Sequence, residues 1–301
     1  MVRWLRHFFA VGNIFDRPSL TPVYERCKAL VGFYYLASVF VLSDDVRVMH
    51  ETALTRPPLE PVWPLLWADG IDVLVLTDVL GVTAVGLALL AYLTGRAIFK
   101  ILFSGAFLLF ASLPNSLGGI NHGFHAWFWI SLVFALLPDD ETRAGKLAYV
   151  YTFATAQTVM LLFYTMAGYW KVQYGILSLL AGQEGNFSPR GLALQLADRM
   201  AQTNTEPLLG AFLVDNYWFA FPMFLFLIYV QFTAVLVAFK PQLHIVWGLI
   251  LVGFHTGTFL LMEIAFPKHI FLLMLLLVSS PFAQPGWFQW RTLREFPLLG
   301  R

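Results

Sequence analysis

Long stretches of the chain are almost purely hydrophobic, and shorter polar stretches separate them. A helix needs roughly 20 residues, range about 17–25, to cross a bilayer, and most of these runs approach or reach that length. The first and third are short for a full span. The runs lie at 29–43, 71–94, 97–113, 121–137, 147–170, 217–239, 243–262 and 264–282. The pattern predicts an all-α, polytopic integral membrane bundle of about 8 transmembrane helices.

The composition supports a membrane protein and excludes several other classes. Hydrophobic residues make up 58% of the 301 and charged residues 12%, whereas soluble domains carry about 25% charged residues. Because lipid requires internally paired backbone groups, we expect one helical membrane domain over 1–301. The net charge of +1 gives no reason to expect a nucleic acid partner, and Cys27 alone builds neither a disulfide nor a cysteine metal cluster.

The distribution of basic residues predicts the orientation. Thirteen of the 19 Lys and Arg residues fall on the side of the amino terminus and six on the other, so both termini should be cytoplasmic. We expect insertion in a bacterial inner (plasma) membrane. Residues 1–28 lack the features of a cleaved signal peptide and are expected to form a cytoplasmic amphipathic segment. The other polar segments are the outer loops 44–70 and 172–216 and the cytoplasmic tail 283–301.

The second outer loop contains its own helical signal. Ser188 is suited to an N-cap and Pro189 to the first helical position. The residues that follow place an apolar stripe at helical spacing, from Leu192 to Ala201. This segment is interpreted either as an amphipathic helix on the outer interface or as a lid over a pocket.

Polar side chains of the predicted bundle gather at one depth. Gln157, Tyr164 and Lys171 are seven residues apart and share a helical stripe, with Gly168 beside it. The inner halves of the helices are nearly bare of titratable groups. Ionisable groups inside a membrane are functional candidates by default. The residues expected in the outer half are Asp78, His122, His125, Lys171, His255 and Glu263.

Each of these residues also has a structural interpretation. Lys171 can extend to the interface as an anchor. His122 can sit at the headgroups, and His125 can be a packed histidine. Asp78 can pair with Lys171 or with a histidine, and 263–268 can form a tight hairpin.

Four possible functions of these polar residues agree with the sequence to different degrees. A haem between His125 and His255 lacks the longer histidine repeat of a two-haem bundle. A zinc hydrolase lacks three closely spaced ligands, so no metal is expected. Transport would place polar residues in both halves of the bundle. A lysine held as a neutral amine among aromatic rings is a competent base and fits Lys171 more naturally.

Four segments carry a resemblance to a known family, in order along the chain. They are FDRPSLTPVYER (15–26), INHGFHAWFWI (120–130), FYTMAGYWKV (163–172) and FHTGTFLLMEIAFPKHIFLLMLLLVSSPF (254–282). Together they resemble the membrane part of the vitamin K-dependent γ-carboxylase and the wider HTTM (horizontally transferred transmembrane) family.

The resemblance implies a role for each site residue. Lys171 would be the base that deprotonates a reduced, vitamin K-like quinone, and His122 would stabilise the developing oxyanion. The implied co-substrates are O2 and CO2. The residues that the resemblance assigns to the quinol pocket are Asn121, His125, Tyr164, Gly168 and His255.

The chain also departs from the family. Trp170 stands where the family has the first of two lysines, and VQYG replaces the acidic continuation. The large substrate-binding domain is expected to be absent. Two functions therefore stay open: a quinol-dependent, lyase-like carboxylase or oxygenase at the outer leaflet, and a non-catalytic membrane partner or maturation factor for a secreted peptide or partner protein.

Overall fold

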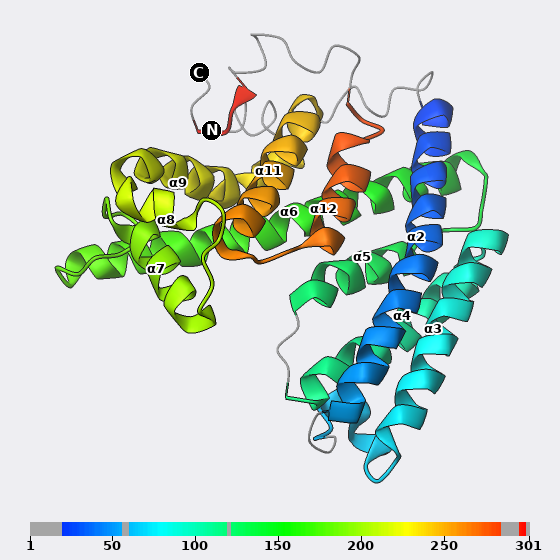
Figure 1. Cartoon of the computed structure of the whole chain (residues 1–301). Coiled ribbons are helices and arrows are strands. Elements are labelled where there is room, and N and C mark those ends of the chain that lie inside the picture. Colours follow the sequence, from blue (N-terminus) through cyan, green and yellow to red (C-terminus); the bar gives the residue numbers. More distant parts are fainter. Residues whose placement is uncertain (1–19, 56–59, 119–121, 284–294, 299–301) are drawn as a thin grey trace. The chain divides into compact units, whose positions relative to one another are not determined.

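The computed structural model describes residues 20–55, 60–118, 122–283 and 295–298 (Figure 1). Within these ranges the chain forms helices and connecting segments and contains no strand, so the predicted all-α class is confirmed. The sequence predicts one domain over 1–301, whereas the chain divides into two compact units. Unit 2 holds the described residues up to Ala156, and unit 1 holds those from Gln157 onward.

Unit 2 contains three long helices, α2, α3 and α4, that run side by side (Figure 1). The α3 helix begins where the Asp72 carboxylate accepts hydrogen bonds from the backbone N–H groups of Leu74 and Val75, and it ends at Gly95 in the left-handed conformation, φ 65°. The elements of this unit are α2 (Leu20–Thr55), η1 (Trp63–Ala68), α3 (Val73–Thr94), α4 (Ala97–Ser116), η2 (His122–Phe124), α5 (His125–Ala135) and the first part of α6 (Arg143–Leu180).

The α2 helix is longer than its apolar run predicts. The hydrophobic run ends at 43, and residues 44–55 are expected in an outer loop, but the helix continues to Thr55. Arg47 pairs with Asp44 at 2.8 Å, one turn apart on the exposed face. Oppositely charged residues three apart support a helix, so they end the hydrophobic run without ending the helix.

The core of unit 2 is aromatic and closed by buried hydrogen bonds. The Tyr34 hydroxyl donates to the Trp127 carbonyl at 2.9 Å, and the Trp127 ring N–H donates to Ser38 Oγ at 3.0 Å. The two rings stack with centroids 5.3 Å apart. Each of these side chains is at most 1% exposed. The bonds fix the rotation of α5 against α2 because a buried polar group without a partner is unfavourable.

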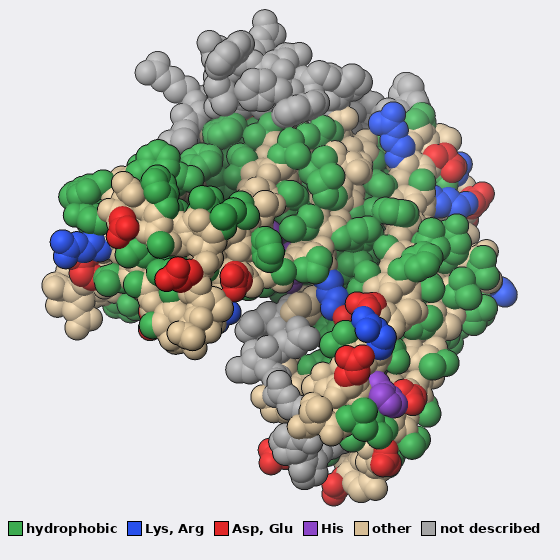
Figure 2. All heavy atoms as spheres, viewed as in Figure 1, with side chains coloured by type: hydrophobic (Ala, Val, Ile, Leu, Met, Phe, Trp, Pro, Cys, Tyr) green, Lys and Arg blue, Asp and Glu red, His purple; other side chains and the backbone are tan. Residues whose placement is uncertain are grey.

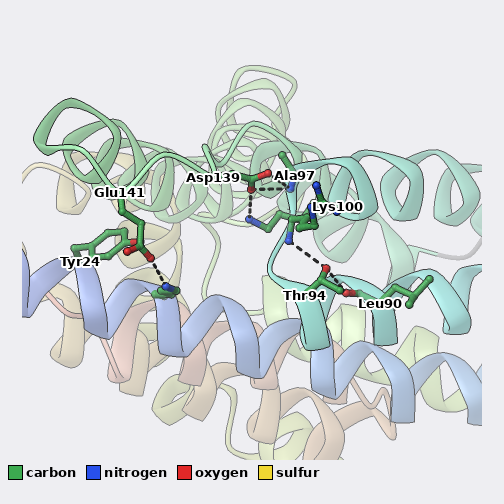
Figure 3. A network of polar contacts seen from close by, with 9 residues as sticks. Tyr24, Leu90, Thr94, Ala97, Lys100, Asp139 and Glu141 are labelled. Carbon is green, nitrogen blue, oxygen red and sulfur yellow. Dashed lines mark hydrogen bonds and ion pairs between the residues drawn. The ribbon is translucent and has the colours of Figure 1, made fainter.

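Carboxylates from the 137–142 connection contact two helices of this unit (Figure 3). Both oxygens of Asp139 accept the Ala97 N–H, at 2.7 and 2.9 Å, and one lies 3.9 Å from the buried Lys100 ammonium. Glu141 accepts a hydrogen bond from Lys28 on α2 at 2.7 Å. This hydrogen bond lowers the pKa of Glu141, so the pairing contributes above the unfolded-state pKa and is lost as the pH falls through the lower folded-state value.

Asp139→Ala is expected to lower the free energy of unfolding by about 1–2 kcal/mol, the range seen on loss of a helix N-terminal cap. The substitution removes the acceptor for the first N–H of α4 and leaves Lys100 without its nearest carboxylate. Thermal unfolding in detergent measures the effect. Asp69→Ala is the control, because Asp69 is exposed and makes no side-chain contact of this kind within the described residues. Equal melting temperatures for the two variants would contradict the prediction.

Unit 1 is built on the second part of α6, from Gln157 to Leu180. The α7 and α8 helices pack on each other and on α9, and α11 packs on α12 and η4. The last of these, η4, is a π-helix. The further elements of unit 1 are α7 (Gly191–Thr203), α8 (Gly210–Asp215), α9 (Tyr217–Phe232), α10 (Ala234–Val237), η3 (Pro241–Leu243), α11 (His244–Met262), α12 (Pro267–Leu273) and η4 (Met274–Val278).

The predicted helix of the 172–216 segment exists, but its predicted N-cap is wrong. The α7 helix begins at Gly191, and Arg190 occupies the N-cap position without a side-chain hydrogen bond. The Ser188 hydroxyl instead donates to the Gly185 carbonyl and accepts the Gly185 N–H. Ser188 therefore closes the turn before the helix. The apolar stripe is confirmed in part, because Leu196 is fully buried in a cluster with Leu213.

Within the described residues, five helices are long and apolar enough to cross a membrane: α2, α3, α4, α6 and 241–262. The two runs that looked short, 29–43 and 97–113, are among them. The runs at 121–137, 217–239 and 264–282 give helices of at most 16 residues or broken ones. Hydrophobic side chains cover much of the visible surface (Figure 2), such as Val75, Val79 and Val82 along one face of α3. An apolar outer surface is what a lipid environment requires.

Candidate functional site

The predicted polar stripe lies on one continuous helix, α6. Gln157, Tyr164 and Lys171 follow one another at intervals of seven residues, a rise of about 10.5 Å per interval. Each meets a different part of unit 1. The side chains of Gln157 and Tyr164 make polar contacts along this face, and Lys171 contributes its backbone carbonyl.

The central contact joins Tyr164 to His255 of α11. The Tyr164 hydroxyl and His255 Nε2 are 2.6 Å apart, and the two side chains are 5% and 4% exposed. The sequence predicts both as pocket residues, and the structure brings these two together. His255 Nδ1 is buried and has no hydrogen-bond partner within the described part of the chain. Tyr164 and His255 therefore form a buried hydrogen-bonded pair of titratable groups that leaves His255 Nδ1 available for a further hydrogen bond.

Aromatic rings and a second imidazole surround His255. The ring centroid of Phe254 lies 4.8 Å away, that of Phe266 4.9 Å and that of His269 5.5 Å. His269 stands in the first turn of α12, directly after Pro267 and Lys268. Sequence reasoning missed His269, although the Pro-Lys-His sequence places a titratable ring at the start of a helix that follows a tight turn.

The first residue of the stripe belongs to another buried polar cluster. Gln157 Nε2 donates to the Leu276 carbonyl of the π-helix and to Ser280 Oγ. His244 Nδ1 lies 2.8 Å from the same Ser280 oxygen, and His244 is 1% exposed. His244 departs from the expectation that this end of the bundle is nearly bare of titratable groups. A single histidine at the start of an apolar run gave no sign of its partners.

Gly168 lies where α6 crosses α9, one turn after Tyr164. A Cβ atom at this position would stand 2.3 Å from Phe232 N and 2.6 Å from its Cα. Nearby, the Thr165 hydroxyl accepts the Val235 N–H at 2.8 Å, just after α9 breaks. Gly168, expected to line a pocket, allows two backbones to meet at this crossing.

Lys171 closes the stripe with a half-buried side chain. Within the described residues its ammonium makes neither a hydrogen bond nor an ion pair with a carboxylate. Its backbone carbonyl accepts a hydrogen bond from Asn186 Nδ2 at 2.8 Å, and Asn186 Oδ1 accepts one from Gln195 of α7 at 2.7 Å. The amide side chains thus tie the segment that carries α7 to α6 at Lys171.

The remaining predicted site residues belong to unit 2. Asn121 lies outside the described residues, and His122 lies in η2. His125 begins α5 and is exposed. Asp78, which the sequence pairs with Lys171 or a histidine, pairs with a histidine, His50 of α2, at 3.1 Å.

Two expectations about the α11–α12 connection are confirmed. Glu263 ends α11 in the left-handed conformation, φ 56°, and Pro267 begins α12. The hairpin between them is three residues long. Among the residues that the structure describes, no group of three His, Cys, Asp or Glu side chains is placed to hold a metal ion.

The fold and these contacts define a class: an all-helical protein with several long apolar helices, of the kind found in integral membrane proteins. Comparison with models of known families, with curated proteins and with solved structures gives no match.

Proposed function

We propose that this protein is an integral membrane enzyme in which Lys171 takes a proton from a lipid-soluble hydroquinone. The observation that carries the proposal is the buried Tyr164–His255 hydrogen bond, 2.6 Å long, on the helix that also presents Lys171. Ionisable groups held inside an apolar bundle are energetically unfavourable unless they find partners, so they are candidates for a functional site. A hydroquinone dissolves in the bilayer and reaches such a site from the side.

The proposed first step is a proton transfer between named atoms. The Lys171 Nζ lone pair accepts the proton of a quinol hydroxyl, which leaves a quinolate anion and an ammonium. No carboxylate of the described residues lies within 4.0 Å of this nitrogen, so the amine forms no ion pair within them. Tyr164 and His255 would orient the quinol ring and exchange protons with it.

The family resemblance supplies the later chemistry of the proposal. The quinolate would react with O2, and the product would serve as the strong base of a carboxylation that uses CO2. The resemblance assigns stabilisation of the oxyanion to His122 and further contacts with the quinol to Asn121 and His125. A secreted peptide or a partner protein would present the group to be carboxylated.

The proposed setting is a bacterial inner membrane with eight spans and cytoplasmic termini. Long apolar helices in the described residues support five of these spans. The excess of Lys and Arg on the amino-terminal side supports the orientation. The Lys171 end of α6 would then face the outer leaflet.

Purified protein should convert a reduced naphthoquinone to its epoxide, and Lys171→Ala should reduce the rate about 100-fold or more, the usual contribution of a general base. Quinone binding should change little, because the amine acts on one proton. Lys268→Ala is the matched control, a lysine of the same unit at the α11–α12 turn. Epoxide formation at the native rate in Lys171→Ala would remove this residue from the mechanism.

The contacts of Asn186 favour a second function, a non-catalytic partner or peptide-maturation factor. Asn186 is 3% exposed and ties the α7 segment to α6, as a fixed docking surface requires. This function predicts that Lys171→Ala and His122→Ala retain activity in cells. Substitutions on the exposed face of α7 would then abolish it.

A further inference from the structure

His255 uses only one of its two ring nitrogens. Nε2 meets the Tyr164 hydroxyl at 2.6 Å, while Nδ1 is buried without a hydrogen-bond partner in the described part of unit 1. A buried polar atom left unpaired is unfavourable by about 1–3 kcal/mol. Buried polar groups are paired in the large majority of cases, so a histidine retained only for packing would be expected to satisfy both nitrogens. The unused nitrogen therefore points to a second role.

The neighbouring titratable ring is His269. The two imidazole centroids are 5.5 Å apart, and the Phe266 ring stands beside both, at 4.9 Å from His255 and 5.6 Å from His269. His255 is 4% exposed, whereas His269 is partly exposed. Tyr164 and His255 are thus both buried, and His269 is the member of the series that reaches toward the surface.

His269 lies next to a turn that is suited to contact water. The hairpin before α12 carries Glu263, which is exposed, and Lys268, which is partly exposed. Charged groups at the end of an apolar helix mark the boundary of the hydrocarbon region. The Phe254 and Phe266 rings pack against His255.

We propose that His255 and His269 form a two-imidazole relay that carries protons between the buried Tyr164 hydroxyl and the surface at the α11–α12 turn. Imidazole is suited to this task because it accepts a proton at one nitrogen and releases one from the other. A proton that reaches His255 at Nε2 leaves from Nδ1, passes to His269 through one bridging water, and is released at the turn. Each ring ends with the proton count it began with.

The relay rests on the proposed function for its purpose, since it would return to solvent the proton that Lys171 removes from a quinol. Its existence is testable without turnover. The readout is the exchange of the His255 ring N–H with solvent deuterium, followed by ¹⁵N NMR of histidine-labelled protein in lipid nanodiscs. The His255 signal is assigned with His255→Gln.

His269→Phe should slow exchange at the His255 ring about 10-fold or more, because it keeps an aromatic ring in place and removes the proton carrier. His269→Gln, a smaller polar variant, should slow it as well, so that the result does not depend on one variant folding. His50→Phe, which removes an exposed histidine of unit 2, is the control and should exchange at the native rate. The Tyr164–His255 hydrogen bond, read from the ¹⁵N shift, should persist in all three.

Native exchange rates in both His269 variants would overturn the relay. Absence of quinol turnover in native protein, with exchange slowed in the His269 variants, would overturn the proposed function and leave the relay standing. Quinol turnover in the native protein together with native exchange rates in the His269 variants would overturn the relay and leave the proposed function standing.

Discussion

Gly168→Ala is expected to destabilise the protein by about 3 kcal/mol, at the upper end of the usual range for overpacking. The added methyl would lie 2.3 Å from Phe232 N and 2.6 Å from its Cα, and the backbone of α9 cannot yield as a flexible side chain can. Either the two helices separate or α6 bends, and in both cases Tyr164, one turn away, is displaced from His255. Denaturant or thermal unfolding in detergent measures the loss.

Gly257→Ala is the matched control for this prediction. Gly257 is also helical and in unit 1, but a methyl group there meets nothing within 4 Å. Alanine is the better helix former by about 1 kcal/mol, so this variant should be neutral or slightly more stable. A Gly168→Ala protein within about 0.5 kcal/mol of native stability would show that the crossing is not as tight as described.

Trp127→Ala should have a comparable effect in unit 2, about 3–5 kcal/mol, the usual range for a fully buried tryptophan. The ring is 1% exposed, stacks on Tyr34 and donates its N–H to Ser38. The substitution opens a cavity and removes a buried hydrogen bond together. The measurement is the change in unfolding free energy, read from far-UV circular dichroism in detergent.

Two further variants separate the causes. Trp127→Phe keeps much of the ring but loses its N–H, so it should lose less stability than the alanine variant. Trp129→Ala removes a ring of the same helix that is 48% exposed, and it should change stability by less than about 1 kcal/mol. If Trp129→Ala is as harmful as Trp127→Ala, then the core is not where the structure places it.

The sequence predicts the helices more accurately than their ends. Periodicity and hydropathy locate α3 and α4 closely, because lipid-facing helices show their apolar residues in the composition itself. They fail on α2, where Asp44 and Arg47 end the hydrophobic run but lie on an exposed face of a continuing helix. They also fail at Ser188. The pattern predicts that its hydroxyl caps a helix, but the hydroxyl bonds to Gly185 in the preceding turn.

The candidate site is predictable along a single helix, whereas between helices only the pair Tyr164 and His255 is anticipated. The spacing of seven is enough to place Gln157, Tyr164 and Lys171 on one face of α6. Partners from other helices depend on tertiary packing, which a lone polar residue in an apolar run does not reveal. His244 and His269 are therefore missed, and Gly168 is assigned to a pocket where it serves a helix crossing.

The break between α9 and α10 limits how the helices around α6 can move. The break leaves the Val235 N–H without an acceptor in its own helix. Within the described residues, this N–H donates only to the Thr165 hydroxyl. In a hydrocarbon solvent no water is present to replace that acceptor. Rotation of α9–α10 against α6 would leave this amide without an acceptor, so we expect these helices to move together with this part of α6.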